Sequence, residues 1–329
     1  MIKADVLFGL VYGDCGKGCI TNELIKSNNY THCLRSSGGA NAGHTIYIGD
    51  DKVVTHAIPS GALHGVRSII GPGCVINEKM FFEELESLEK SVPGIASWVK
   101  IAYNTHVTTE EHLAEEIGES KIGTTKKGIG PAYRDKYGRT GIRAESVPAF
   151  KDYVVDIYEE FHSGKNVEIM CEGAQAIGLD IDWGNYPYVT SSHCGVGSVL
   201  NNGIPHNALR NVIGVAKCYD TYVGSSAFQD PNDPILKKLG DAGHEYGATT
   251  GRRRQINYLN LDMIIRHVNM MGPNKVYFNK LDILAEVGAW KLIYSGKLLV
   301  FEDEKSFTTF VEMQLPGIDV IFSSSPYGI

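Results

Sequence analysis

The sequence lacks the features that mark secreted, disulfide-bonded and membrane-spanning proteins. Its 7 cysteines are an odd number and no two are spaced as Cys-x-x-Cys, which argues against a disulfide framework and a zinc ribbon. No apolar run approaches the roughly 18 residues of a membrane span, and the N-terminus has no signal-peptide pattern. We therefore expect a protein of the cytoplasm, or of the host cytoplasm if the chain is viral, with no membrane partner.

Positive charge is also scarce. The chain has 31 lysines and arginines against 38 acidic residues, a formal net charge of −7. Sequence-independent nucleic-acid binding needs clustered cations that neutralise phosphates, so we expect no nucleic-acid partner. The exception is local, because residues 249–254 read TTGRRR and guanidinium groups bind carboxylates and phosphates through two parallel hydrogen bonds. A solvated basic loop is the plain alternative, but this segment in an acidic protein favours an anion site.

Short apolar runs recur along the chain and predict buried strands, because parallel strands covered on both faces are continuously apolar. Helical patterns lie between these runs, and Leu292–Phe301 reads as a hairpin around Ser295-Gly296. We therefore expect an α/β fold, a single domain over residues 1–329 with a mainly parallel central sheet flanked by helices. The expected strands are Asp5–Leu10, Ser68–Ile70, Val167–Cys171, Val212–Cys218, Lys275–Phe278 and Asp319–Phe322, and the expected helices are Met80–Lys90, Asp152–Phe161 and Leu259–Met271.

The central segment Ile122–Arg143 is rich in Gly, Thr and Lys and has little apolar periodicity. A segment of this length without structure of its own is often a functional loop. We therefore expect large active-site loops on the α/β scaffold.

The first predicted strand leads into the glycine loop Gly13–Gly18 and then a helix over Ile20–Lys26. Backbone N–H groups and the helix N-terminus of such a unit hold phosphate, and Lys17 adds a positive charge, so the fold is P-loop-NTPase-like. The loop is not a Walker A motif, because the Ser or Thr that would bind Mg²⁺ after the lysine is missing. Asp14 can supply an oxygen for Mg²⁺ instead. A plain glycine turn with a solvated lysine is the alternative for this loop alone.

A second loop, Gly38–Thr45, packs three glycines around Asn41 and His44. Glycines let the backbone approach a ligand closely. His44 can donate a hydrogen bond to charge that develops on a phosphoryl oxygen, or act as a general acid. A purely structural histidine is the alternative.

Seven ordered motifs over roughly residues 9–282 resemble the adenylosuccinate synthetase family. Each motif is weak alone, but their order makes chance agreement very improbable. They are GDCGKG at 13–18, GGANAGHT at 38–45, HAIPSG at 56–61, IGTTKKGIGPAY at 122–133, EGAQ at 172–175 with DID at 180–182 and YPYVTSS at 186–192, GATTGRRR at 247–254, and KLD at 280–282.

The resemblance implies a ligase that works in two steps. The N1 proton of IMP, a purine 5'-monophosphate, is removed and its 6-oxygen attacks the γ-phosphate of GTP. The amine of L-aspartate then displaces phosphate from the 6-phosphoryl intermediate and gives adenylosuccinate, with Mg²⁺ as cofactor. This chemistry needs a base, a charge clamp and exclusion of water.

The resemblance also implies roles for the residues at matching positions. Asp14 would be the base, His44 the acid and Lys17 a further catalytic residue, while Asp14 and the Gly43 carbonyl would bind Mg²⁺. Arg139 matches an arginine that crosses a dimer interface to the partner's nucleotide, which implies a homodimer. The monophosphate would contact Asn41, Thr125, Arg139, Gln175, Thr190 and Arg254; L-aspartate would contact Thr249, Thr250 and Arg252; and the donor nucleotide would contact Gly16, Lys17, Gly18, Lys280, Asp282, Ser323 and Ser325. A carboxylate at 282 can accept from both N1–H and N2–H of guanine, which favours GTP over ATP.

Departures from the family pattern leave the purine open. The chain is shorter than usual between Ile142 and Val167, Cys15 replaces a glutamate, and Ser191–Ser198 and Tyr222–Phe228 differ. Related phage enzymes use dGMP, with ATP, dATP or GTP as donor, and make 2-aminoadenylosuccinate for diaminopurine DNA. Many of those replace the base with serine, so Asp14 favours IMP, whereas the short length and the altered pocket loops favour the phage-type branch.

Two hypotheses lie outside the ligase class. A nucleotide-binding regulatory protein would keep the fold without catalysis, but Asp14, His44 and Arg252 are all present. A P-loop kinase would transfer phosphate without aspartate, but the Walker Ser or Thr is missing.

Overall fold

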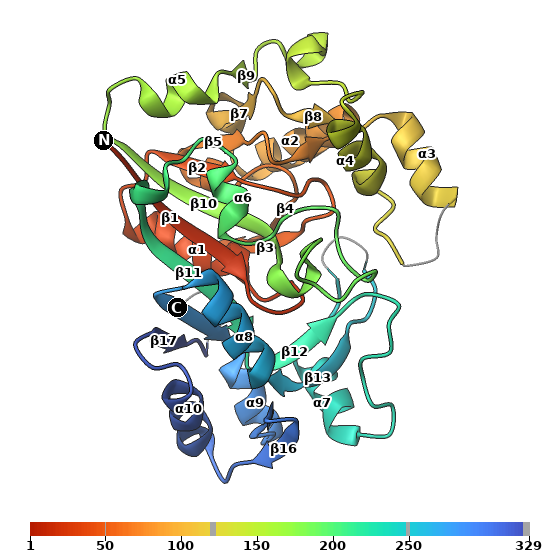
Figure 1. Ribbon diagram of the computed structural model, residues 1–329, viewed down its shortest axis with the longest axis vertical. Coiled ribbons are helices and arrows are strands. Elements are labelled where there is room, and N and C mark those ends of the chain that lie inside the picture. The colour runs from red at the N-terminus through yellow and green to blue at the C-terminus, as the bar shows by residue number, and fades with distance from the viewer. Residues whose placement is uncertain (50, 119–122, 248–250, 325–329) are drawn as a thin grey trace.

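The computed structural model describes residues 1–49, 51–118, 123–247 and 251–324. Its centre is a nine-stranded sheet with the order β17-β14-β11-β1-β10-β2-β5-β7-β9. Every neighbouring pair in this sheet is parallel, which confirms the predicted mainly parallel sheet. In Figure 1, β9 and α5 lie at one end of the molecule, and β17 and α10 at the other. The strands are β1 (Ile2–Gly9), β2 (His32–Arg35), β5 (Arg67–Ile70), β7 (Val99–Ala102), β9 (Val154–Val155), β10 (Val167–Ala176), β11 (Leu209–Lys217), β14 (Lys275–Asn279) and β17 (Asp319–Phe322).

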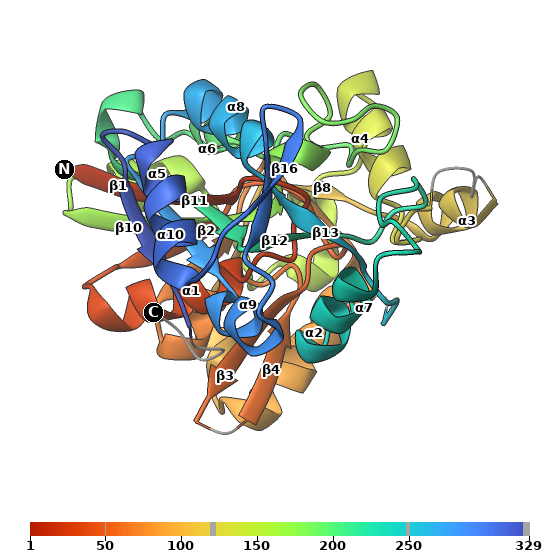
Figure 2. The same cartoon turned by 90° about the horizontal axis from the view of Figure 1, so that it is seen from below.

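Helices cover both faces of the central sheet. Leu7 of β1 shares an apolar cluster with Ile20 of α1 (Lys17–Ser27), whereas Val6 and Phe8 share another with Ile264 of α8 (Leu261–Met271). Successive strand residues point to opposite faces, so a strand covered twice must be apolar throughout. Figure 2 shows α8 and α1 on opposite sides of the sheet. The other helices are α2 (Glu78–Ser91), α3 (Glu110–Gly118), α4 (Ile129–Gly138), α5 (Ile157–His162), α6 (Val196–Leu200), α7 (Pro234–Ala242), α9 (Leu281–Val287) and α10 (Glu304–Met313).

Three smaller sheets surround the central one. β12 (Tyr219–Tyr222), β13 (Gln255–Asn260), β15 (Lys291–Tyr294) and β16 (Lys297–Val300) form a four-stranded sheet. Its β15–β16 hairpin turns at Ser295 and Gly296, whose φ angles are 50° and 67°, as the predicted hairpin requires. The two-stranded sheets pair β3 (His44–Ile48) with β4 (Asp51–Thr55), and β6 (Val75–Ile76) with β8 (His106–Val107).

The loops with candidate functional residues follow the carboxyl ends of the central strands. The connection from β1 runs to β2 on one side, whereas the connection from its neighbour β11 runs to β14 on the other side, so a crevice forms at this switch point. The first glycine loop follows β1 and the second follows β2, while Gln175, Lys217 and Asn279 stand at the ends of β10, β11 and β14. None of the described helices has the length and apolar character that a membrane span requires.

Two predictions about the first half of the chain are wrong in their boundaries. The helix after the first glycine loop begins at Lys17 rather than Ile20, because Gly16 adopts a left-handed conformation (φ 87°) and starts it earlier. The segment Ile122–Arg143 is not wholly a loop, since Ile129–Gly138 form α4. The buried residues Ile129, Ala132 and Tyr133 supply an apolar face only about one turn long, which is too short to stand out as periodicity.

Two predicted helices begin too early. α5 begins at Ile157 rather than Asp152, because the Asp156 side chain accepts from Tyr158 N at 2.8 Å and caps it. Residues Val154–Val155 form β9 instead, beside β7. α8 begins at Leu261 rather than Leu259, because Asn260 accepts from Met263 N at 3.0 Å. Residues 259 and 260 belong to β13.

Candidate active site

The loop after β1 turns through three residues with positive φ: Gly13 (85°), Asp14 (48°) and Gly16 (87°). A Cβ at Gly16 would lie 2.6 Å from Nδ2 of Asn279, so only glycine fits there. α1 begins at Lys17, which is buried, with Nζ 3.9 Å from Cys15 Sγ. Gly16, Lys17 and Gly18 therefore lie together at a helix N-terminus, an arrangement that binds phosphate.

Asp14 forms an ion pair with Arg254, which follows it by 240 residues. Arg254 Nε donates to Asp14 Oδ2 at 2.9 Å, and Arg254 Nη1 donates to Glu245. Glu245 is buried and also accepts from Lys217 Nζ at 2.8 Å and from Tyr219 OH at 2.6 Å. Burial favours a high pKa for Glu245, but the charges of Lys217 and Arg254 outweigh it and lower the pKa to about 2. Side chains of alternating charge thus form a chain that runs from buried Lys217 through Glu245 and Arg254 to Asp14.

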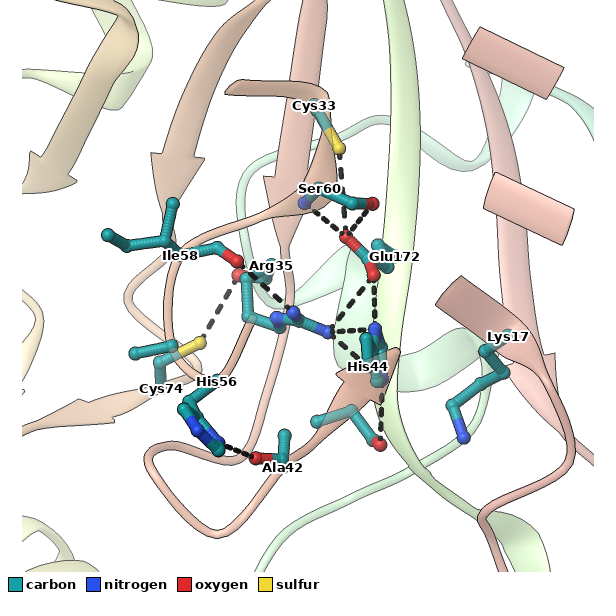
Figure 3. Close-up of polar contacts among 12 residues, drawn as sticks. Lys17, Cys33, Arg35, Ala42, His44, His56, Ile58, Ser60, Cys74 and Glu172 are labelled. Atoms are coloured by element: carbon teal, nitrogen blue, oxygen red, sulfur yellow. Dashed lines mark hydrogen bonds and ion pairs between the residues drawn. The ribbon is translucent and has the colours of Figure 1, made fainter. Parts of the chain in front are cut away.

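His44 lies at the start of β3, against Glu172 and Arg35 (Figure 3). Its Nδ1 is hydrogen-bonded to Glu172, and Arg35 Nη1 lies 3.1 Å from Nδ1 and 3.4 Å from Nε2. An ionised carboxylate only accepts hydrogen bonds, so the proton is assigned to Nδ1, facing Glu172. Burial and the charge of Arg35 lower the pKa of His44 to about 4, which makes the imidazole neutral at pH 7.

Glu172 of β10 is the fixed partner of this histidine. It is fully buried and accepts from Ser60 through the backbone N at 2.9 Å and Oγ at 2.8 Å. Burial favours a high pKa, but the charge of Arg35 and the contacts with His44 lower the pKa of Glu172 to about 2. Figure 3 shows Glu172 between Ser60 and His44, so the ionised carboxylate sets the orientation of the imidazole.

The two glycine loops touch each other at Gly18. A Cβ there would lie 2.9 Å from the Cβ of His44 and 3.2 Å from the carbonyl oxygen of Thr45. The glycine therefore permits the start of α1 to approach the second loop, where half-buried Gly43 precedes His44. The phosphate loop and the histidine that sequence analysis assigned to catalysis are neighbours.

The amide of Gln175 is buried, and neither Oε1 nor Nε2 has a hydrogen-bond partner within the described chain. Oε1 would lie 2.8 Å from a Cβ at Gly38, so the amide lies against the second glycine loop. In the same loop, Asn41 Nδ2 donates to Thr190 Oγ1 at 3.4 Å. A buried amide without partners is rare, and a ligand with one donor and one acceptor would satisfy it.

The residues assigned to the donor base also lie together. Lys280 precedes α9 with φ 70°, its Nζ donates to Gly243 O at 3.3 Å, and Asp282 stands in the first turn. Ser323 is adjacent, because its carbonyl accepts from Leu281 N at 3.2 Å. Asn279, one residue before Lys280, donates from Nδ2 to Cys15 O at 2.7 Å and joins this region to the phosphate loop. Ser325 lies outside the described residues.

Other assigned residues are not brought into contact with these groups by any described interaction. Half-buried Thr125 lies between α3 and α4, and exposed Arg139 follows α4 with φ 63°. Arg252 is exposed, and its carbonyl accepts from Gly247 N at 2.8 Å. Thr249 and Thr250 lie outside the described residues.

Sequence analysis did not single out four charged residues of the site: Arg35, Glu172, Lys217 and Glu245. Arg35 and Lys217 are the last residues of β2 and β11, and Glu172 directly follows the apolar run Val167–Cys171. A charge at the carboxyl end of a buried parallel strand lies at the ligand crevice. The sequence pattern could therefore have indicated Arg35, Lys217 and Glu172 as site residues. Glu245 lies between α7 and β13, and no sequence pattern indicates its role.

A parallel sheet with a phosphate loop after β1 and buried charge pairs at the switch point defines a nucleotide-binding α/β enzyme. Residues 6–166 and 144–298 match the family model described as adenylosuccinate synthetase. The chain belongs to the adenylosuccinate synthetase family, and it is a carbon–nitrogen ligase.

Similar proteins span most of the chain. An adenylosuccinate synthetase of Trichoplax adhaerens is 35% identical and aligns with 95% of this chain and 84% of its own length. The adenylosuccinate synthetase of Thermoplasma volcanium is 33% identical and aligns with 90% of this chain and 79% of its own length. The structure of fully ligated adenylosuccinate synthetase from Plasmodium falciparum matches with a TM-score of 0.85 and 28% identity, over 99% of this chain and 98% of that one. The fold is shared with succinoaminodeoxyadenylate synthetase of cyanophage S-2L, whose structure contains dGMP and dATP. The TM-score is 0.77 and the identity 20%, over 99% of this chain and 93% of that one.

Proposed function

We propose that the chain joins L-aspartate to C6 of IMP at the expense of GTP, giving adenylosuccinate, GDP and phosphate. The observation that carries this proposal is the position of Asp14, a carboxylate inside the phosphate loop and paired with Arg254. A base at that position lies where a phosphoryl donor would bind, so the group that activates the purine oxygen and its phosphoryl donor meet.

In the first step, Asp14 takes the N1 proton of IMP and the electron pair moves to the 6-oxygen. That oxygen forms a bond to the γ-phosphorus as the bond to the bridging oxygen breaks and GDP leaves. Lys17 and the N-terminus of α1 stabilise the negative charge on the phosphates. Arg254 remains paired with Glu245 when Asp14 becomes neutral.

His44 is proposed to donate from Nε2 to the phosphoryl group. Its Nδ1 proton faces Glu172, so donation from Nε2 requires the charged imidazolium. The low pKa of about 4 belongs to the described arrangement, in which Arg35 adjoins the ring. Polyphosphate beside Lys17 would raise this pKa, because an adjacent anion favours the charged form.

In the second step, the amine of aspartate attacks C6, the C6–O bond breaks and phosphate leaves with the former purine oxygen. Thr249, Thr250 and Arg252 are proposed to bind the aspartate carboxylates. The monophosphate is assigned to Asn41, Thr125, Thr190, Gln175 and Arg254. The close contact between Asn41 and Thr190 and the unpaired amide of Gln175 support this assignment.

Mg²⁺ is proposed to bind the carboxylate of Asp14 and the carbonyl of Gly43. These are hard oxygen donors, and the pair with Arg254 uses Oδ2 of Asp14 and leaves Oδ1 outside that contact. When bound, Mg²⁺ would neutralise charge on the donor phosphates.

We also propose that the whole chain acts as one catalytic domain within a homodimer. The exposure of Arg139 at the end of α4 supports its assignment to the monophosphate of the partner. GTP is the proposed donor, because Asp282 and Ser323 adjoin the end of β14. The 7 free cysteines fit a reducing compartment such as the cytoplasm.

The test is product formation by the purified protein with Mg²⁺, GTP, L-aspartate and IMP, GMP or dGMP in parallel. We expect adenylosuccinate from IMP, identified by mass, and no phosphate release without aspartate. Preference for dGMP would instead indicate the phage-type reaction. Phosphoryl transfer without aspartate would indicate a kinase, and no product with any acceptor would contradict the proposal.

A further inference from the structure

Arg254 is shared by two carboxylates in very different surroundings. Its Nε contacts Asp14, whose side chain is 26% exposed, and its Nη1 contacts Glu245, whose side chain is 1% exposed. The backbone N of Arg254 also donates to Glu245 O at 3.0 Å. Arg254 is therefore fixed mainly by Glu245, whereas its contact with the more exposed Asp14 is the one that can break.

Glu245 is itself held from the opposite side. Lys217 Nζ donates to both of its oxygens, at 2.9 and 2.8 Å, and also to Thr221 Oγ1 at 3.1 Å. Tyr219 OH adds a bond of 2.6 Å. Burial lowers the pKa of Lys217 to about 8, and its pair with Glu245 works against that shift. The carboxylate that holds Arg254 therefore has little freedom to move.

We propose that Glu245, anchored by Lys217 and Tyr219, is a positioning residue that fixes Arg254 and, through Arg254, orients the carboxylate of Asp14. The inference rests on the proposed function. Arg254 contacts Asp14 through Nε and Glu245 through Nη1, so the position of its guanidinium group depends on both carboxylates.

The same geometry shows what the loss of Glu245 would change. The side chain of Arg254 is only 12% exposed, and Glu245 is the more deeply buried of its two carboxylate partners. Without Glu245, the guanidinium would lose this fixed partner, and Asp14 would lose the group that orients it. A displacement of about 1 Å at a catalytic group can lower the rate by roughly 100-fold.

Glu245→Gln tests the inference, because it keeps the size of the side chain and removes its charge. We expect kcat to fall by roughly 10- to 100-fold, up to the effect of misplacing a catalytic group by about 1 Å, while KM for GTP changes less than about threefold. The variant also leaves Lys217 buried without a counter-ion, so its Tm should fall. Glu115→Gln is the matched control, since Glu115 pairs with Arg134 on the surface and its loss should leave kcat unchanged.

The double variant Lys217→Met/Glu245→Gln separates positioning from stability. Removing the unpaired lysine should restore Tm, but kcat should stay low because Arg254 still lacks Glu245. Recovery of kcat together with Tm would show a purely structural role and overturn the inference, as would an unchanged kcat in Glu245→Gln. If the wild-type protein itself forms no product, the proposed function fails and the inference falls with it.

Discussion

At the scale of single residues, Asp14 stands in an unusual setting: a carboxylate inside a loop that attracts anions. It lies just before Lys17 and the N-terminus of α1, and Arg254 pairs with it directly. The proposed base therefore lies beside the groups that are proposed to bind the phosphate donor.

Replacing this base should stop the reaction without unfolding the protein. We expect Asp14→Ala to lower kcat by roughly 10²- to 10⁴-fold, the usual contribution of general acid–base catalysis, with Tm nearly unchanged because the side chain is partly exposed. Asp241→Asn is the control, since Asp241 pairs with Arg253 on the surface and should not affect turnover. Substantial activity in Asp14→Ala, measured by phosphate release, would exclude Asp14 as the base.

The buried His44 should make stability depend on pH. Its pKa is about 4 in the folded protein against an ordinary 6.5, so the unfolded chain binds the proton more strongly. The contribution of His44 to the free energy of unfolding is therefore fully present above pH 6.5 and is lost as the pH falls toward 4. The pKa of His106 is lowered in the same direction, so His44 accounts for part of the effect.

His44→Asn should reduce this dependence, because asparagine can donate to Glu172 but does not titrate. We expect Tm of the wild type to fall by several degrees more than Tm of the variant between pH 7 and pH 5. His193→Asn, a substitution of a half-exposed surface histidine, should behave like the wild type. Parallel Tm curves for wild type and His44→Asn would contradict the lowered pKa of His44.

The residues of this site differ in how far sequence alone reveals them. Asp14, His44 and Gln175 lie in glycine-rich motifs, and the structure places each at the crevice. Lys217 and Glu245 act through a contact between residues 28 apart in sequence, and no local pattern indicates that pairing. Charge pairs formed by the fold can be seen only once the strands are placed.

At the scale of elements, the start of α9 and the phosphate loop are assigned to different parts of the donor nucleotide. Asp282 stands in the first turn of α9 and is assigned to the base, whereas Asn279 bonds the carbonyl of Cys15 and supports the phosphate loop. Asp282 should therefore select the base of the donor nucleotide, and Asn279 should help the loop to hold its phosphates.

Two variants separate these roles. We expect Asp282→Asn to lower the ratio of kcat/KM for GTP over ATP by roughly tenfold or more, because guanine then loses a charged acceptor. Asn279→Ala should raise KM for both nucleotides several-fold and leave their ratio unchanged. An unchanged ratio in Asp282→Asn, or a changed one in Asn279→Ala, would reject the respective assignment.

The apolar strand runs predicted the central sheet well, since a strand covered on both faces leaves a continuous apolar run. Helix boundaries were less predictable, because Asp156 and Asn260 end a strand and cap a helix within a few residues. α4 was missed because its apolar face is short. The two stretches that match the family model overlap at residues 144–166, the region where the chain is shorter than its family's pattern.

At the scale of the whole molecule, the proposed homodimer would affect the site through Arg139. This residue is exposed at the end of α4, and a second copy of the chain is its proposed target. A homodimer with shared sites would contain one Arg139 and one Asp14 from different copies at each site.

Mixing two inactive variants tests this arrangement. Asp14→Ala and Arg139→Ala should each be nearly inactive, but a hybrid dimer would contain one site with both residues intact. Random exchange of subunits makes half of the dimers hybrids, so about a quarter of wild-type activity should return. A mixture no more active than its separate components, despite confirmed subunit exchange, would contradict the shared site.

The central claim is that the protein activates the 6-oxygen of a purine by phosphorylating it. The most direct measurement uses IMP labelled with oxygen-18 at that position and follows the label by mass spectrometry during turnover with GTP and L-aspartate. If the 6-oxygen is phosphorylated and then displaced, each released phosphate should carry one oxygen-18 atom. Unlabelled phosphate, with the oxygen-18 found in water or retained in the product, would contradict the claim.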